Sequence, residues 1–226
     1  MNSRMPRKPE PPIMDLPDEV AAYAHADFAQ VNEAFIARLM ELAGELCHSA
    51  RCIDLGTGPA DIPIRLVRAC PTWHVTAVDA SPPMLGFARH AINQAGLAHA
   101  IEPMLADAKN TGLAARTFDV IISNSILHHI DDTTRFWQEV RRLVRRGGLV
   151  FVRDLFRPDS VDAAGEIVHR YAAQESDLLK AEYHRSLLAA YTLEEVAAQL
   201  AAAGIRELQV TVSSDRHMDI SGRLCE

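Results

Sequence analysis

The sequence predicts an α/β fold, in which a doubly wound and mostly parallel sheet ends in an antiparallel hairpin. Short apolar runs alternate with helical segments as far as Arg153, and these runs cover residues 51–55, 73–79, 100–105, 118–123 and 149–153. Strict alternation of this kind is typical of parallel strands joined by right-handed crossovers. Turns bound each run, which indicates a sheet covered on both faces. Two further strand-like runs, 206–212 and 217–224, flank a polar turn and predict the closing hairpin.

Each helical segment is predicted from its periodicity or its end signals. Two helices are expected within residues 17–48, where apolar residues recur at helical spacing. Ser81 followed by two prolines predicts a helix start, and Thr192 with Glu195 three residues later forms a capping-box pattern. The apolar stripe of residues 132–146 predicts a helix that Gly147 caps.

The chain of 226 residues is long enough for one domain with a substantial core, since 48% of its residues are hydrophobic. We expect a loose proline-rich tail at 1–15, a helical cap at 16–48 and a helical insertion over the site at 158–190. The net charge of −7 argues against a nucleic-acid partner. No apolar run approaches the length of a membrane span, so no membrane partner is expected. The tail lacks the apolar core of a signal peptide, so export is not expected either and the default location is cytoplasmic. The sequence is silent on oligomeric state.

The most informative stretch joins the first strand to the following helix. An apolar run ends in Asp54, and a turn of small residues follows at Gly56, Gly58 and Ala60. Such a turn brings bare backbone close to a nucleoside-bearing ligand. A second acidic residue, Asp79, closes the next apolar run, where a carboxylate can accept both hydroxyls of a ribose.

This D-x-G-x-G-x-A pattern resembles the first motif of class I S-adenosylmethionine (SAM)-dependent methyltransferases, with an alanine at the last glycine position. The resemblance covers roughly residues 50–224 and implies the seven-stranded Rossmann-like sheet of that family, with SAM as cofactor. It implies that Asp54 helps to hold the ammonium group of SAM and that Asp107 accepts the adenine amino group. The cofactor-binding residues that it implies are Asp54, Gly56, Thr57, Gly58, Asp79, Ala80, Met84, Asp107, Ala108, Asn124 and Ser125.

Candidate catalytic residues lie at the ends of the fourth and fifth strands. Asp154 ends the fifth strand and can act as a base or a hydrogen-bond acceptor; a salt bridge to a neighbouring arginine is an equally weighted alternative. His128 and His129 follow the fourth strand and are further candidate bases. Adjacent histidines on a turn are expected to point in different directions, so no metal site is predicted.

Candidate substrate contacts come from the segments expected around the opening of the site. Tyr183, Arg185 and Tyr191 lie in or beside the insertion, Tyr23 lies in the N-terminal segment, and Arg153 ends a strand. Together with Arg216, the two arginines raise the possibility of an anionic group on the substrate, because a guanidinium pairs bidentately with a carboxylate.

The predicted function is therefore transfer of a methyl group from SAM to a small-molecule acceptor with a nitrogen, oxygen, sulfur or carbon nucleophile. Several alternatives stay open: a protein or tRNA methyltransferase, a non-catalytic module that binds SAM or a partner, and aminopropyl transfer. A nicotinamide oxidoreductase is disfavoured, because Asp61 stands where the third glycine of the dinucleotide-binding motif belongs.

Overall fold

The computed structural model describes the whole chain except residues 1–4, 12, 45–48 and 226, so the parts of the predicted tail and helical cap that fall there are outside the described residues. A seven-stranded sheet with the order β3-β2-β1-β4-β5-β7-β6 forms its centre. The strands are β1 (Arg51–Leu55), β2 (His74–Asp79), β3 (Ile101–Leu105), β4 (Phe118–Asn124), β5 (Val144–Leu155), β6 (Gln209–Val212) and β7 (His217–Leu224).

The sheet is parallel from β3 through β5, and β7 pairs antiparallel with both β5 and β6. Both the parallel body and the closing hairpin were predicted and are confirmed. The order reverses between β1 and β4, and such a switch point is where open α/β sheets bind ligands, beyond the carboxyl ends of the strands.

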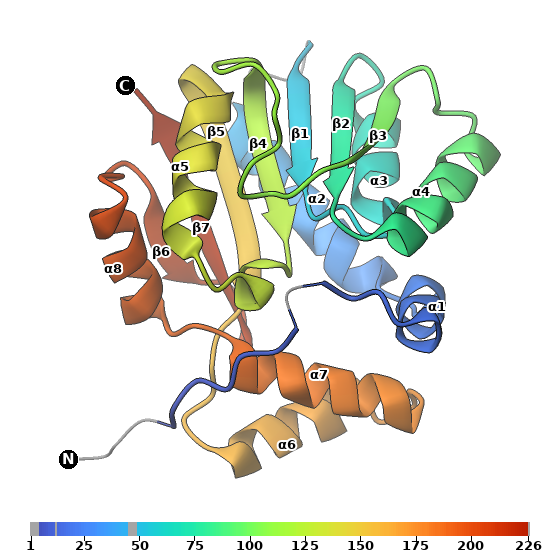
Figure 1. Ribbon diagram of the computed structural model, residues 1–226, viewed down its shortest axis with the longest axis vertical. Helices are drawn as coiled ribbons and strands as arrows, with labels where there is room; N and C mark the ends of the chain where they lie inside the picture. Colours follow the sequence, from blue (N-terminus) through green and yellow to red (C-terminus); the bar gives the residue numbers. More distant parts are fainter. Residues whose placement is uncertain (1–4, 12, 45–48, 226) are drawn as a thin grey trace.

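Helices cover both faces of the sheet, as Figure 1 shows. One face carries α2 (Ala29–Ala43), α3 (Asp61–Ala69) and α4 (Pro82–Gln94), and the other carries α5 (Thr133–Leu143) and α8 (Leu193–Ala202). Phe35 of α2 stacks on Phe151 of β5 with ring centroids 4.5 Å apart, so most of α2 packs on the sheet instead of covering the site. On the opposite face, Trp137 of α5 is fully buried.

The end signals read from the sequence operate as predicted at two helices. The Ser81 side chain accepts a hydrogen bond from the Met84 N–H at the start of α4, and Thr192 and Glu195 form a complete capping box at α8. The prediction for Gly147 was wrong: α5 ends at Leu143. The next residue pairs with β4, so Gly147, with φ of 74°, belongs to the irregular first part of β5.

The remaining helices lie at the carboxyl ends of the strands. They are α1 (Pro17–His25), the short helix η2 (Leu127–His129), α6 (Val161–Tyr171) and α7 (Asp177–Ala189). Figure 1 shows α6 and α7 beyond this edge of the sheet, with the N-terminal segment running along α7. Among the described residues, no helix is both long and apolar enough to cross a bilayer.

The N-terminal segment of residues 5–11 is tied to this edge, in contrast to the loose tail predicted for 1–15. The Arg7 guanidinium donates hydrogen bonds to the carbonyl oxygens of Ala189 (2.6 Å) and His128 (2.7 Å). The Lys8 N–H donates to the Leu188 carbonyl at 3.0 Å. Charged hydrogen bonds to backbone carbonyls, which composition alone does not reveal, therefore hold a proline-rich segment in place.

Candidate active site

A cavity of about 1150 Å³ opens at the carboxyl ends of the strands. Its first part, here called the cofactor half, is lined by the ends of β1 to β4: Gly56, Gly58, residues 79–82, Met84, residues 105–109, Asn124 and Ser125. Its second part, the acceptor half, is lined by residues 13–14, α1, the first turns of α2, η2, α6, α7 and the hairpin turn. The two halves form one continuous space.

The small-residue turn after β1 has a backbone conformation that restricts which residues can occupy it. Gly56 has φ of 79° and Gly58 has φ of 54°, both in the left-handed region. A Cβ atom built on Gly56 would clash with the side chain of Ile126. The N–H groups of Gly56 and Thr57 both donate to the Val78 carbonyl at 2.8 Å, which holds the turn against β2. The turn thus presents bare backbone to the cofactor half.

Asp79 lies in the cavity wall beside this turn. Its two carboxylate oxygens accept hydrogen bonds from the N–H groups of Gly58 and Ser81, each at 2.8 Å. Burial raises the pKa of Asp79, although these backbone donors act in the opposite direction. Because a carboxylate oxygen can accept more than one hydrogen bond, Asp79 can also accept from a ligand in the cavity.

Asp54 and Thr57 lie behind the turn and do not line the cavity. Burial, together with the negative charge of Asp79, raises the pKa of Asp54 to about 7. A cation bound in front of the turn would favour the ionised form of this carboxyl group. Asp54 is therefore placed to act on a ligand through its charge.

The remaining predicted cofactor residues line the same half. Its wall includes Ala80, Met84, Ala108 and Asn124. Asp107 is also in the wall; its side chain is half exposed and accepts a hydrogen bond from the Lys109 N–H at 2.8 Å. Ser125, also in the wall, has φ of 58°, an unusual conformation for a residue with a side chain, and its N–H donates to the Arg153 carbonyl at 2.9 Å.

Asp154 is fully buried behind the cavity and orients His128. Its Oδ2 accepts the Leu127 N–H at 2.6 Å, and its Oδ1 lies 2.5 Å from Nδ1 of His128. An ionised carboxylate can only accept, so the imidazole Nδ1–H donates to Asp154 and Nε2 faces away from it. Burial alone would lower the pKa of His128, but the charge and hydrogen bond of Asp154 outweigh burial and raise it. The alternative interpretation, a salt bridge between Asp154 and an arginine, is not formed among the described residues.

The two histidines do not point apart as predicted. Their ring centroids lie 4.4 Å apart with the planes inclined by 36°, and both rings line the cavity. Glu10, which was not predicted as a site residue, lies against both: its Oε1 is 3.4 Å from Nε2 of His128 and 3.6 Å from Nδ1 of His129. Burial, and the positive charge of His128, lower the pKa of His129 to about 4. Glu10 has no local sequence signal, because it reaches this site from 118 positions earlier than His128 along the N-terminal segment.

Two of the predicted substrate contacts, Tyr23 and Tyr183, line the acceptor half. Burial raises the pKa of each to about 12, so both phenols stay protonated near neutral pH and can donate hydrogen bonds. Arg153 also lines the cavity, but its guanidinium is engaged in a bidentate pair with Asp219, at 2.6 and 2.8 Å.

The other two predicted contacts lie outside the cavity wall. Arg185 is half exposed and pairs with Glu19 and Glu182. Tyr191 donates its hydroxyl to the Ile130 carbonyl at 2.6 Å, and the Arg7 guanidinium lies over its ring at 4.1 Å from the centroid. Both side chains therefore hold the segments around the acceptor half together instead of facing its interior.

The acceptor half also contains Arg216, which was considered with Arg153 and Arg185 as a possible partner of an anionic substrate group. Arg216, in the hairpin turn, lies over the Tyr171 ring at 3.3 Å from its centroid, and both residues line the cavity. Its neighbour His217 also lines the cavity, and burial lowers the pKa of His217 to about 4, so its imidazole is neutral. The predicted hairpin turn thus contributes side chains to the cavity wall.

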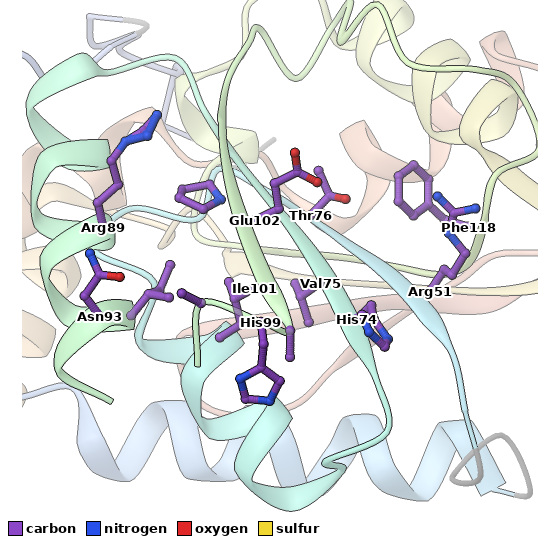
Figure 2. A pocket seen from close by; sticks show the side chains of 14 residues that line it. Arg51, His74, Val75, Thr76, Arg89, Asn93, His99, Ile101, Glu102 and Phe118 are labelled. Carbon is purple, nitrogen blue, oxygen red and sulfur yellow. The ribbon is translucent and has the colours of Figure 1, made fainter. Parts of the chain in front are cut away.

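A second hollow, of about 670 Å³, lies at the opposite end of the sheet. Figure 2 shows the basic side chains Arg51, His74, Arg89 and His99 in its wall, together with Glu102. Arg51 and His74 are the first residues of their strands, so this hollow faces away from the glycine turn. Ligands of open α/β sheets bind at the carboxyl ends of the strands, and we therefore assign the site to the larger cavity.

Comparison with known proteins agrees with this assignment. Residues 53–152 match the family model described as a methyltransferase domain. A demethylmenaquinone methyltransferase of Thermotoga maritima is 28% identical over 59% of this chain and 56% of its own length. A malonyl-[acyl-carrier protein] O-methyltransferase of Geobacter sulfurreducens is 28% identical over 81% of this chain and 66% of its own. The chain thus spans less than two thirds of these curated relatives.

Solved structures share the fold over nearly the whole chain. A SAM-dependent methyltransferase from Aquifex aeolicus superposes with a TM-score of 0.72 over 93% of this chain and 100% of its own, at 17% identity. A protein of the same description from Methanococcus maripaludis gives a TM-score of 0.73 over 98% of both chains, at 16% identity.

The residues present fit the cofactor of this family. The glycine cradle at Gly56 leaves no room for a side chain, and Asp79 and Asp107 present carboxylates from the ends of two neighbouring strands. This acidic wall suits the hydroxyl, amino and sulfonium groups of SAM better than a pyrophosphate. The fold, the turn and the methyltransferase domain matched over residues 53–152 together support a class I SAM-dependent methyltransferase, with SAM as the cofactor.

Proposed function

We propose that this protein transfers a methyl group from SAM to a small-molecule acceptor held in the acceptor half of the cavity. The observation that carries the proposal is the continuity of the two halves, because donor and acceptor must meet in one enclosed space. When bound, SAM supplies an electrophilic methyl group on its sulfonium. The protein's own contribution is to hold the acceptor in line with that bond and to exclude water.

The segments around the acceptor half favour a small acceptor over a macromolecule. Residues 5–11 and α7 lie across the carboxyl edge of the sheet, fastened by Arg7 and by the Lys8 backbone. A folded protein or an RNA would need this cover to move aside. One relative is named for demethylmenaquinone, which agrees with a small acceptor, and the other is named for a malonyl group carried on an acyl carrier protein.

His128 is the residue best placed to act on the acceptor. Its side chain lines the cavity, while Asp154 fixes the orientation of the ring through Nδ1 and leaves Nε2 on the side of Glu10. A neutral His128 can take a proton from an acceptor group that must be deprotonated, and Asp154 is then a positioning residue. Tyr23 and Tyr183 offer aromatic surface and hydroxyl donors to the acceptor.

Calorimetry on the full chain tests the cofactor part of the proposal. SAM and S-adenosylhomocysteine are expected to bind, and NAD is not. Replacement of Asp79 by alanine should weaken SAM binding by about 10- to 100-fold, the effect of losing one or two hydrogen bonds to a charged group. Asp162→Ala, on the exposed start of α6, is the matched control. Binding of NAD without SAM would contradict the proposal.

A screen for release of S-adenosylhomocysteine tests the acceptor part. The panel should contain hydroxylated, amino and thiol metabolites, run beside a cell extract with methyl-labelled SAM. Turnover with a small compound supports the proposal. Label that enters protein or RNA while every small compound fails would replace it with a macromolecular acceptor.

A further inference from the structure

Three side chains with metal-binding groups converge where the N-terminal segment meets η2. A carboxylate oxygen of Glu10 and one ring nitrogen each from His128 and His129 all lie within 4.8 Å of one another. Glu10 Oε1 is 3.4 Å from Nε2 of His128 and 3.6 Å from Nδ1 of His129. Two ligands of one tetrahedral ion, each about 2.0–2.1 Å from it, stand roughly 3.4 Å apart. The separations of Glu10 from the two histidines are therefore close to those of groups that share an ion.

The orientation of His128 is the one that a metal ligand needs. Its Nδ1–H donates to Asp154, which also accepts the N–H groups of Leu127 and Leu155, at 2.6 and 2.7 Å. The carboxylate is thus fixed by the backbone, and it leaves the lone pair of Nε2 directed toward Glu10. A carboxylate behind a metal-binding histidine sets its tautomer and raises the basicity of the ligating nitrogen.

Glu10 supplies an independent sign that a ligand belongs here. Its side chain is only 5% exposed, and Oε1 is buried without a hydrogen-bond partner among the described residues. This oxygen faces the lone pair of Nε2, so two acceptors meet in a buried place. Such a contact is unfavourable unless a proton or a cation lies between them.

We propose that Glu10, His128 and His129 bind one divalent transition-metal ion of the zinc class, with its remaining coordination positions facing the acceptor half of the cavity. Two imidazoles and a carboxylate suit zinc and its first-row neighbours, and the cluster contains no thiolate that would select a softer ion. Both histidines line the cavity, so three protein ligands leave a position open to it.

Neighbouring groups both support and oppose the ion. The Asp154 charge favours it, whereas Arg7, whose guanidinium binds the His128 carbonyl, opposes it and is partly balanced by Asp131 at 3.5 Å. The Pro11 carbonyl lies 3.0 Å from Nδ1 of His129, so this histidine must give up a hydrogen bond when it coordinates through that atom.

The open position indicates the chemistry of the acceptor, an extension that rests on the proposed methyl transfer. With an ion bound, Nε2 of His128 would be a ligand and would no longer act as a base. A hydroxyl group on the ion would be held in one place and would lose its proton to solvent more easily. Its oxygen would then take the methyl group, and S-adenosylhomocysteine would leave. The acceptor class favoured by this site is therefore a hydroxylated small molecule that is methylated on oxygen.

Metal titration of the full chain tests the site directly. Protein stripped with a chelator should bind one equivalent of Zn²⁺, and bound Co²⁺ should give visible absorption bands of low coordination number. Glu10→Gln and His129→Gln should remove this binding, and Asp154→Asn should weaken it by about 10- to 100-fold. His169→Gln and Glu166→Gln, both on the exposed side of α6, are controls that should leave it unchanged.

The wild-type titration does not depend on the folding of any variant. Circular dichroism should first show that the stripped wild-type protein is folded. If this protein then binds neither Zn²⁺ nor Co²⁺ more tightly than Glu10→Gln does, the metal site is overturned. In that case a proton shared by Glu10 and His128 occupies the site. Full affinity in His129→Gln would also overturn the three-ligand site. SAM calorimetry on the stripped protein separates the two proposals: SAM binding without zinc binding rejects the metal site alone, and loss of SAM binding rejects the proposed function.

Discussion

The two halves of the cavity are built in different ways. The cofactor half consists of strand ends and the turns that directly follow them, so neighbouring positions in the sequence stay neighbours in the site. Gly56, Gly58 and Asp79 are held there by hydrogen bonds within adjacent strands. The acceptor half is assembled from segments that are far apart in the chain, and its walls are mostly side chains.

This difference indicates how each half can change. Backbone shape defines the cofactor half, so it tolerates few substitutions. The acceptor half depends on long-range contacts such as the hydrogen bonds of Arg7 to the end of α7 and to η2. Substitutions in one of its segments can therefore change the acceptor half without disrupting the sheet. The predictions below test whether the two halves separate in this way.

The largest effect on the rate of methyl transfer is expected at His128, the candidate base of the acceptor half. We expect His128→Gln to lower the rate of methyl transfer by about 100- to 10,000-fold, the usual contribution of a positioned acid or base. The affinity for SAM should stay within about twofold, because His128 does not touch the glycine turn. Steady-state kinetics with SAM calorimetry measures both, and His169→Gln is the control. A parallel loss of SAM affinity would show that the halves are not separable.

The next effect concerns the backbone of the cofactor half. Gly56→Ala places a methyl group against Ile126 at a left-handed φ, which alone costs about 1–2 kcal/mol. We expect the free energy of unfolding to fall by at least this amount and SAM binding to weaken by about tenfold or more. Gly86→Ala is the matched control, since its Cβ meets nothing within 4 Å inside α4 and should stabilise the helix slightly.

A double variant separates the steric clash with Ile126 from the strained backbone conformation at position 56. Gly56→Ala combined with Ile126→Ala frees the space but keeps the strained φ. Partial recovery of SAM affinity, measured by calorimetry, is expected. Complete recovery would mean that backbone conformation contributes nothing at this turn.

A third prediction uses the buried carboxyl group of Asp54, whose pKa is raised to about 7. Its ionised fraction rises from about one tenth at pH 6 to about nine tenths at pH 8. A cationic ligand in front of the turn binds the ionised form better, so SAM affinity should increase by about tenfold over this range. The stability of the ligand-free protein should change in the opposite direction: a raised pKa means that the folded state binds more protons, so stability is lost as pH rises from about 4 to about 7.

Isothermal calorimetry at several pH values measures this dependence, and Asp54→Asn should flatten it. The measurement bears on the cofactor half alone. A dependence that survives in Asp54→Asn but disappears in Asp79→Asn would assign the titration to the residue in the wall.

The difference between the cofactor half and the acceptor half also explains which features the sequence could predict. The strands along the chain, the glycine turn and the carboxylates at strand ends follow local patterns with a fixed spacing, and their positions were predicted to within a few residues. Glu10 was missed as a site residue because only the tertiary fold brings it to His128 and His129. Arg185 and Tyr191 were placed on the correct segments, but the face that each presents depends on partners such as Glu19 and Ile130.

The prediction for the end of α5 failed for a related reason. The apolar stripe continues through Val144, so the periodicity favours a longer helix, but pairing of Val144 with Phe118 of β4 begins the strand there. Tertiary hydrogen bonds thus outweigh the local preference. The loose tail was mispredicted in the same way, because proline content does not reveal the carbonyl groups that Arg7 meets.

The smallest effect is expected at Arg7, which fastens the N-terminal segment to the acceptor half. Arg7→Ala leaves the carbonyls of Ala189 and His128 without this donor, at a cost of about 1–3 kcal/mol for docking of the segment. We expect faster amide exchange in residues 5–11 and a KM for the acceptor that rises several-fold, with SAM affinity unchanged. Lys8→Ala is the matched control, because Lys8 docks through its backbone N–H, which the substitution keeps. Equal effects of the two substitutions would mean that the backbone contacts hold the segment, and that the guanidinium adds little to the enclosure of the acceptor.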